Sequence, residues 1–372
     1  MVFLFHVLGV YLLWITARAL NFQPLTVGIG LALYGLSLPV VVYAQYAYTD
    51  LLTGYVTFGT GALLWLHARS QKSRYLWLAS TLAGLGVFLH VKLLIFPLLA
   101  FPLYAGYLVW RQEKKTWSER LGQFFRTYRL AALATALSLT VLVILFCYQQ
   151  YLWTGYFRPD GVFVLLEQQG NLDFDGFFQA SPVYILQSLL GLFWDGENGL
   201  LFNAPLFLLT FPGLVVFTKR YPRAGVLTAT VIFLLLLRQA SYREWRTWGP
   251  PARYLTTFVP GFFIFSLYAL ALLLRKWWGK LAVLFFGGYT FALSLTLFVA
   301  GKFGYPEYRG ESAYFSQLLS WVNLSGFGDF LTLTLYPSYD SVFEYWGAGL
   351  LTGIWLVMCG YFYFYTPPEA LQ

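Results

Sequence analysis

Residues 254–274 read YLTTFVPGFFIFSLYALALLL, an apolar run of 21 residues without a charged side chain, bounded by Arg253 and Arg275. As an α-helix this run would be about 31 Å long, close to the roughly 30 Å thickness of a bilayer's hydrocarbon core. The run is continuously apolar rather than alternating, which favours a helix over a barrel strand, because a helix satisfies each backbone amide within its own segment. We therefore expect a membrane-spanning helix here.

Runs of the same kind recur along the chain, which is 59% hydrophobic and only 11% charged. They lie at about residues 2–20, 25–45, 49–66, 75–91, 93–110, 130–152, 201–217, 224–239, 254–274, 281–299 and 346–365, and the run at 224–239 is the shortest. A water-soluble fold has no use for so much apolar sequence. We predict an all-α polytopic membrane protein with about eleven transmembrane helices, in which residues 1–372 form a single membrane domain.

The charged residues orient these helices. Sixteen of the 24 basic residues fall on one side, at Arg18, Arg69, Lys72, Arg74, Arg111, Lys114, Lys115, Arg120, Arg126, Arg129, Lys219, Arg220, Arg223, Arg275, Lys276 and Lys280. The positive-inside rule makes that side cytoplasmic, together with the C-terminus. The net charge of +8 thus reflects topology and gives no reason to expect nucleic-acid binding. We expect a multi-pass protein of a bacterial inner membrane.

Three connections are long. Residues 153–200 and 300–345 are predicted external excursions with short interfacial helices, one of them at Pro182–Trp194, and residues 111–129 are a cytoplasmic amphipathic connection. Cys147 and Cys359 fall near opposite ends of their helices, too far apart to be bridged. The three histidines are scattered and have no metal-site spacing, so no metal site is predicted.

Charge and aromatic surface gather in Ser241–Pro260, which reads SYREWRTWGPPARYLTTFVP and lies on the predicted outer side. Charged residues at a membrane boundary are costly and mark candidate sites. Two more such residues lie on the outer side. Asp50 either matches a helix dipole or carries chemistry, and Lys92 either reaches to lipid head groups or binds a phosphate.

Four short stretches, in this order, resemble the GT-C superfamily of integral-membrane glycosyltransferases, of the dolichyl-phosphate-mannose–protein mannosyltransferase and aminoarabinose-transferase type. They are YAYTD at 46–50, AGLGVFLHVK at 83–92, GLLFNAPL at 199–206 and WGPPARYL at 248–255. The last differs from the family's GPRYL wording, because Pro251 and Ala252 intervene before Arg253. The likeness covers most of residues 1–300.

The resemblance implies transfer of a sugar from a polyprenyl-phosphate donor to an acceptor at the external face. A carboxylate would take the acceptor's proton, and cations would hold the departing phosphate. On this view Asp50 is the catalytic or acceptor-orienting carboxylate, and Lys92 and Arg253 bind the lipid phosphate. Arg243 and Arg246 are weaker candidates for the same anion, and Trp245 and Trp248 either stack on a sugar or anchor at the interface. The sugar, the acceptor and any cofactor stay unspecified.

The chain departs from the family at its start. The family's first helix and its acidic first external loop, which carries the catalytic aspartate, have no counterpart here, because residues 2–20 already run from outside to inside in the predicted topology. We therefore expect a fragment, a protein completed by another polypeptide, or a homologue that has lost the activity. The last case is the alternative function: a non-catalytic scaffold subunit that assembles with partner membrane proteins.

Overall fold

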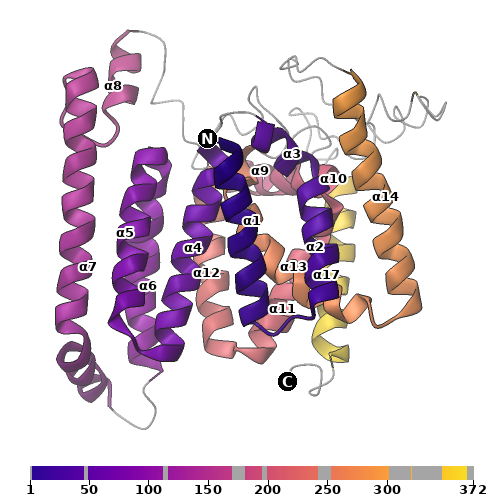
Figure 1. The fold of residues 1–372 in the computed structure, drawn as a ribbon, viewed down its shortest axis with the longest axis horizontal. Helices are drawn as coiled ribbons and strands as arrows, with labels where there is room; N and C mark the ends of the chain where they lie inside the picture. The colour runs from indigo at the N-terminus through magenta and orange to yellow at the C-terminus, as the bar shows by residue number, and fades with distance from the viewer. Residues whose placement is uncertain are drawn as a thin grey trace. The chain divides into compact units, whose positions relative to one another are not determined.

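Every element that the structure describes is a helix (Figure 1). The structure is a computed structural model that describes residues 2–45, 49–111, 116–169, 181–194, 199–241, 253–300, 320 and 346–366. These residues fall into two compact units, described separately below. Unit 1 comprises residues 1–51, 179–225 and 236–372, and unit 2 comprises residues 52–178 and 226–235. The predicted all-α architecture is confirmed for the described residues.

Three described helices are long and apolar enough to cross a membrane. They are α7 (Trp117–Thr154), α12 (Pro222–Ala240) and, in its described part Trp277–Thr296, α14 (Trp277–Ala300). The bent pair formed by α2 (Pro24–Leu36) and α3 (Leu38–Gln45) makes a fourth if it counts as one span. The shortest predicted run, 224–239, is thus part of a helix with spanning length. That the chain crosses the membrane about eleven times remains a prediction.

Three parallel helices form the centre of unit 1. They are α11 (Thr210–Arg220), α13 (Val259–Leu273) and α17 (Trp346–Tyr365). Thr210 meets Ser266 and Phe217 meets Tyr268, so α11 and α13 run in the same direction. Trp355 lies against Phe211, and Lys219 reaches Tyr363, so α17 follows that direction too. The alternation of the predicted spans requires the same relative directions.

Two further helices of unit 1, α2 and α14, run against this trio. Tyr34 of α2 packs on Phe263, while Phe22, just before α2, packs on Tyr268, so α2 is antiparallel to α13. α14 follows the direction of α2, because Gly287 lies beside Leu33 and Ser294 donates a hydrogen bond to the carbonyl of Leu36. α1 (Val2–Ala19) packs against α2 and α3.

Two predicted continuous runs are broken in the structure. The run 25–45 bends by 66° between α2 and α3. The break falls at Ser37, whose hydroxyl donates to the carbonyl of Tyr34 at 2.6 Å, and Pro39 follows in the first turn of α3. The run 201–217 divides into α10 (Leu200–Asn203), the 3₁₀ helix η2 (Pro205–Leu209) and α11, because Pro205 supplies no amide hydrogen to continue α10.

Lys219 of α11 binds the C-terminal end of α17. Its ammonium group donates to the carbonyls of Tyr363 at 2.6 Å and Thr366 at 3.3 Å, and it also lies 5.1 Å from the centre of the Tyr363 ring. The last carbonyls of a helix have no hydrogen-bond partner within the helix and carry partial negative charge. A lysine at this position donates hydrogen bonds to them and places a positive charge beside them.

We expect Lys219→Met to destabilise the protein by about 1–2 kcal/mol, because it leaves these carbonyls without their cationic donor. The measurement is the thermal unfolding midpoint, together with hydrogen exchange of α17. Lys280→Met removes an exposed lysine just past the start of α14 and serves as the control. Equal effects of the two substitutions would contradict a capping role for Lys219.

Unit 2 is a helix bundle in which successive helices reverse direction, so that α5 and α7 run in parallel. α4 (Thr49–Ser70) turns at Gln71 into α5 (Ser73–Leu89), which continues through the 3₁₀ helix η1 (Val91–Leu94) into α6 (Ile95–Trp110). α7 then packs along α5, so closely that a Cβ on Gly84 would lie 2.3 Å from a methyl carbon of Leu142. The short helix α8 (Gly161–Gln168) packs against the end of α7.

The predicted connection 111–129 and the predicted span 130–152 are not separate. From Trp117 to Thr154 they form one helix, α7, which starts at a capping box of Thr116 and Glu119. The amphipathic part and the apolar part are thus continuous in one helix, and the cytoplasmic placement of 111–129 stays a prediction. Of the predicted external excursions, 153–200 contains α8 and α9 (Pro182–Trp194), so the predicted short helix is confirmed. Apart from Ser320, the excursion 300–345 lies outside the described residues.

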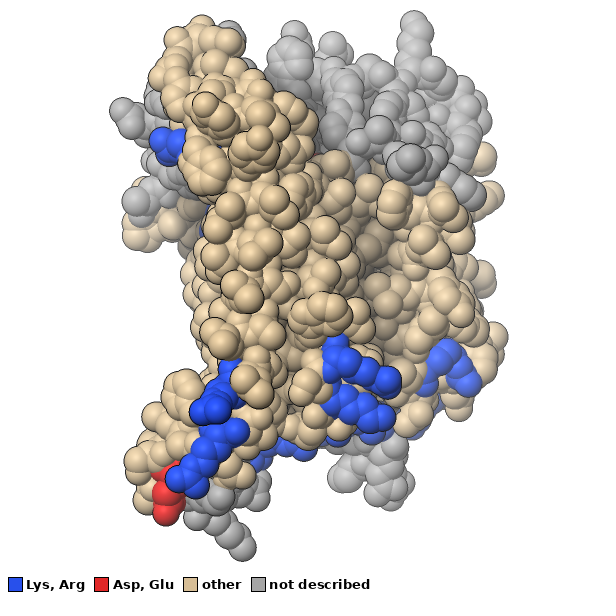
Figure 2. Space-filling model, turned by 60° about the vertical axis from the view of Figure 1, so that its left-hand side comes forward, with Lys and Arg blue, Asp and Glu red and all other residues tan. Residues whose placement is uncertain are grey.

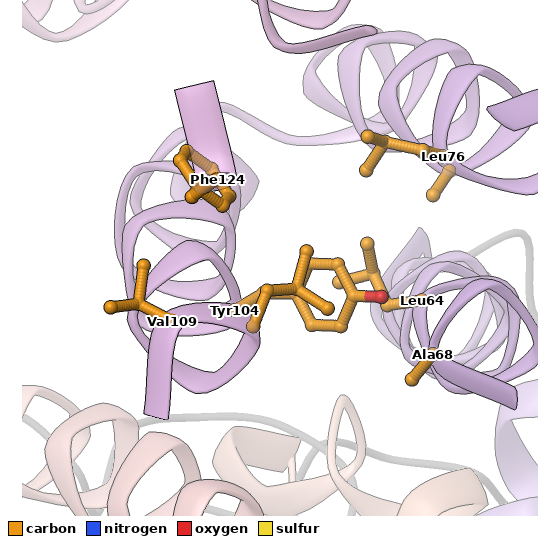
Figure 3. Close-up of a cluster of buried hydrophobic side chains, with 8 residues drawn as sticks. Leu64, Ala68, Leu76, Tyr104, Val109 and Phe124 are labelled. Carbon is orange, nitrogen blue, oxygen red and sulfur yellow. The ribbon is translucent and has the colours of Figure 1, made fainter. Parts of the chain in front are cut away.

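A buried cluster joins α4, α5, α6 and α7 in unit 2 (Figure 3). Figure 3 shows Tyr104 reaching from α6 toward Leu64 and Ala68 of α4. Its hydroxyl lies 2.6 Å from Nδ1 of His67, which is fully buried on α4. Tyr128 of α7 completes the arrangement, because its ring lies 5.7 Å from the His67 ring and its hydroxyl donates to the side chain of Gln71.

We expect Tyr104→Phe to cost about 1–3 kcal/mol of stability, because it leaves Nδ1 of His67 buried without a hydrogen-bond partner. A thermal unfolding midpoint measures the effect. Tyr107→Phe, on the same helix, controls for loss of a tyrosine hydroxyl as such. If Tyr104→Phe is as stable as the control, the His67–Tyr104 bond does not hold α4 and α6 together.

Candidate functional site

Asp50 is the buried carboxylate among the three acidic side chains that the structure describes. It lies in the first turn of α4 with 8% of its surface exposed. The other two have evident structural roles. Glu119 accepts a hydrogen bond from the backbone amide of Thr116 at 2.8 Å, and Asp160 binds Arg158 at 2.5 and 2.7 Å. A buried carboxylate at a helix start meets the positive end of the helix dipole. The position of Asp50 therefore fits both interpretations, a charge matched to the helix dipole and a residue that carries chemistry.

Asp160, by contrast, has no character of a base. The side-chain hydrogen bonds from Arg158 lower the pKa of its carboxyl below the ordinary value, while burial acts in the opposite direction. A carboxylate with a lowered pKa and a bound guanidinium accepts a proton less readily. Asp160 also lies on an exposed turn after α7. It therefore serves as a matched comparison for Asp50.

Lys92 lies in η1, just after α5 ends at Leu89, and its side chain is outside the described part. α4 and α5 are antiparallel neighbours, and a Cβ on Gly86 would lie 2.7 Å from the Val56 side chain. The end of the α4–α5 pair at which α4 begins is consequently the end at which α5 gives way to η1. Asp50 and Lys92 lie toward that same end along their helices.

Arg253 is the first residue of η3 (Arg253–Leu255), directly ahead of α13, and its side chain is likewise not described. In unit 1 this is also the end toward which the N-termini of α11, α13 and α17 point. The aligned peptide dipoles of these parallel helices put partial positive charge at this end. Arg253 therefore lies at an end of unit 1 that favours anions. Arg243, Arg246, Trp245 and Trp248 lie outside the described residues.

One polar residue at this end was missed by the sequence reasoning. Asn203 ends α10, is fully buried, and donates from its side-chain amide to the carbonyl of Gly199 at 2.8 Å. Nearby, the Tyr289 hydroxyl donates to the carbonyl of Phe202 at 3.0 Å. α10 also packs against α3, the helix that leads toward Asp50. The available signal was a lone amide inside an apolar run, immediately ahead of a proline.

In the described ranges no group of three histidine, cysteine or acidic side chains could hold a metal ion, and Cys147 and Cys359 are both free. The candidate residues are instead two basic residues in short 3₁₀ helices, Lys92 and Arg253, and the buried Asp50. The chain matches no protein-family model, no curated protein and no solved structure. The functional argument consequently rests on these residues and on the resemblance described above.

Proposed function

We propose that this chain is a membrane glycosyltransferase of the GT-C type, which transfers a sugar from a polyprenyl-phosphate donor to an acceptor at the external face. The observation that carries the proposal is Asp50. It is the one described carboxylate that is buried, and it begins α4 at the end of the α4–α5 pair where Lys92 follows α5. A buried carboxylate at the start of a helix suits proton transfer to or from a bound acceptor.

In the proposed reaction an acceptor oxygen attacks the anomeric carbon of the donor. The bond between that carbon and the phosphate oxygen breaks, and the polyprenyl phosphate leaves with the bonding electron pair. Asp50 orients the acceptor or takes its proton. Lys92 and Arg253 stabilise the charge that develops on the leaving phosphate, with the helix N-termini of unit 1 adding to the effect of Arg253.

The neighbouring residues of Ser241–Pro260 have lesser parts in this proposal. Arg243 and Arg246 supply further positive charge to the same phosphate. Trp245 and Trp248 stack on the sugar or anchor the segment at the interface. Placing the protein in a bacterial inner membrane with a cytoplasmic C-terminus belongs to the same proposal, because the donor phosphate must then meet the site from the outer leaflet.

The test is turnover by the full chain in lipid nanodiscs supplied with polyprenyl-phosphate-linked mannose or aminoarabinose carrying a labelled sugar. The proposal expects loss of label from the lipid with release of polyprenyl phosphate, in the presence of a membrane extract that provides acceptors. Absence of turnover with both donors, together with stable co-purification of a partner membrane protein, would instead favour the non-catalytic scaffold subunit.

A further inference from the structure

The first three turns of α7 do not fit inside a membrane together with the rest of the helix. α7 has 38 residues, which makes it about 57 Å long, almost twice the roughly 30 Å of hydrocarbon. Its apolar part lies toward Thr154, and its arginines lie at positions 120, 126 and 129. The segment Trp117–Arg129, here named the basic segment, must therefore lie at or beyond the boundary of the hydrocarbon.

The apolar face of the basic segment has two edges, one buried against unit 2 and one exposed. Phe124 and Tyr128 form one edge and are held by unit 2: Phe124 is 8% exposed in the buried cluster, and Tyr128 contacts His67 and Gln71. Leu121 and Phe125, four residues apart, form the other edge and are 43% and 60% exposed, and Trp117 at the start of the segment is 63% exposed. The protein thus fixes the rotation of the segment and leaves an apolar stripe uncovered.

Exposed arginines border this stripe. At 100° per residue, Arg129 lies about 40° and Arg126 about 100° beyond Phe125 around the helix, and the two arginines are three residues apart on one face. Both are exposed. Glu119, the acid that the segment contains, is used by the capping box with Thr116. In Figure 2, blue lysine and arginine side chains lie on the part that protrudes at the lower left, next to one acidic side chain in red.

We propose that the basic segment is a binding site for the anionic head groups of a phospholipid bilayer. Arg126 and Arg129 bind the phosphates, while Leu121 and Phe125 enter the boundary between head groups and acyl chains. An exposed apolar stripe flanked by arginines on a helix at membrane depth is the chemistry that recognises an anionic bilayer surface. The site does not involve the residues proposed for sugar transfer, because Arg126 and Arg129 lie near the start of α7 in unit 2.

The experiment uses the full chain with a nitroxide label at position 125, introduced as Phe125→Cys in a Cys147→Ala, Cys359→Ala background. The protein is placed in nanodiscs of phosphatidylcholine with or without phosphatidylglycerol. Label depth is measured from collisions with oxygen and with a water-soluble nickel complex. We expect the label in the acyl boundary when phosphatidylglycerol is present, and a shift toward water in pure phosphatidylcholine or at high salt.

Variants separate the arginines from other causes. Arg126→Gln with Arg129→Gln should return the label to water and weaken binding of spin-labelled phosphatidylglycerol by roughly fivefold per arginine. Arg126→Lys with Arg129→Lys should restore the depth, and Arg275→Gln with Lys276→Gln, an exposed pair elsewhere, should leave it unchanged. A label equally deep in pure phosphatidylcholine would overturn the proposal. Displacement by millimolar inorganic phosphate would also overturn it, because it would indicate a site for soluble anions.

Discussion

Replacing Asp50 by asparagine is expected to lower the rate of sugar transfer by about 10²–10⁴-fold, the usual contribution of a positioned acid or base. Asparagine has nearly the same shape and keeps an acceptor oxygen, so the buried start of α4 can persist. What it loses is the ability to take a proton from the acceptor. The measurement is the initial rate of polyprenyl phosphate release by the nanodisc-embedded protein.

Asp160→Asn is the matched control for this substitution. Asp160 is exposed and bound by Arg158, so its loss should leave the transfer rate unchanged. A thermal midpoint close to that of the unmodified protein would show that Asp50→Asn still folds. Transfer at an undiminished rate by a folded Asp50→Asn protein would contradict the catalytic assignment and leave Asp50 as a residue matched to the helix dipole.

Gly213→Ala is expected to cause the largest loss of stability among single-methyl additions in the described residues of unit 1. A Cβ at this position would lie 1.8 Å from the carbonyl oxygen and 2.6 Å from the carbonyl carbon of Phe265. These are backbone atoms of α13, so no side chain can move aside, and α11 and α13 must separate. We expect a cost of about 3 kcal/mol, at the upper end for overpacking.

The matched control is Gly261→Ala on α13, where an added Cβ meets nothing within 4 Å. That variant should be as stable as the unmodified protein, because alanine also favours the helix. Thermal or denaturant midpoints in one detergent measure both variants. If Gly213→Ala unfolds at the same midpoint as Gly261→Ala, the close contact between α11 and α13 is not a feature of the folded protein.

Sequence alone was a good guide to where helices occur and a poor guide to where they break. Continuous apolar composition marks a helix in lipid, and this is why the runs at 281–299 and 346–365 correspond closely to α14 and α17. Hydropathy does not register a local hydrogen bond such as that of Ser37, or the missing amide of Pro205. Hydropathy also separates a polar part of α7 from an apolar part, although both belong to one continuous helix. Helix boundaries depend on these local groups.

The candidate site was predictable in part for the same reason. An acid at the edge of an apolar run is conspicuous, so Asp50 could be singled out, but its burial depends on tertiary packing that one sequence does not encode locally. The parallel direction of α11, α13 and α17 also adds helix-dipole charge near Arg253, an effect that appears only once the helices are assembled. Asn203 was missed because an amide in an apolar run carries no charge signal.

The central claim is that this chain binds a lipid-linked phosphate through Lys92 and Arg253. The most direct measurement is the affinity of the nanodisc-embedded protein for polyprenyl phosphate, compared among Lys92→Gln, Arg253→Gln and the exposed control Lys276→Gln. Loss of one charged hydrogen bond, worth about 1.5–3 kcal/mol, predicts an affinity lowered by roughly 10-fold to 100-fold in each of the first two. We expect unchanged affinity in the control. Equal affinity in the unmodified protein and all three variants would contradict a phosphate site at Lys92 and Arg253.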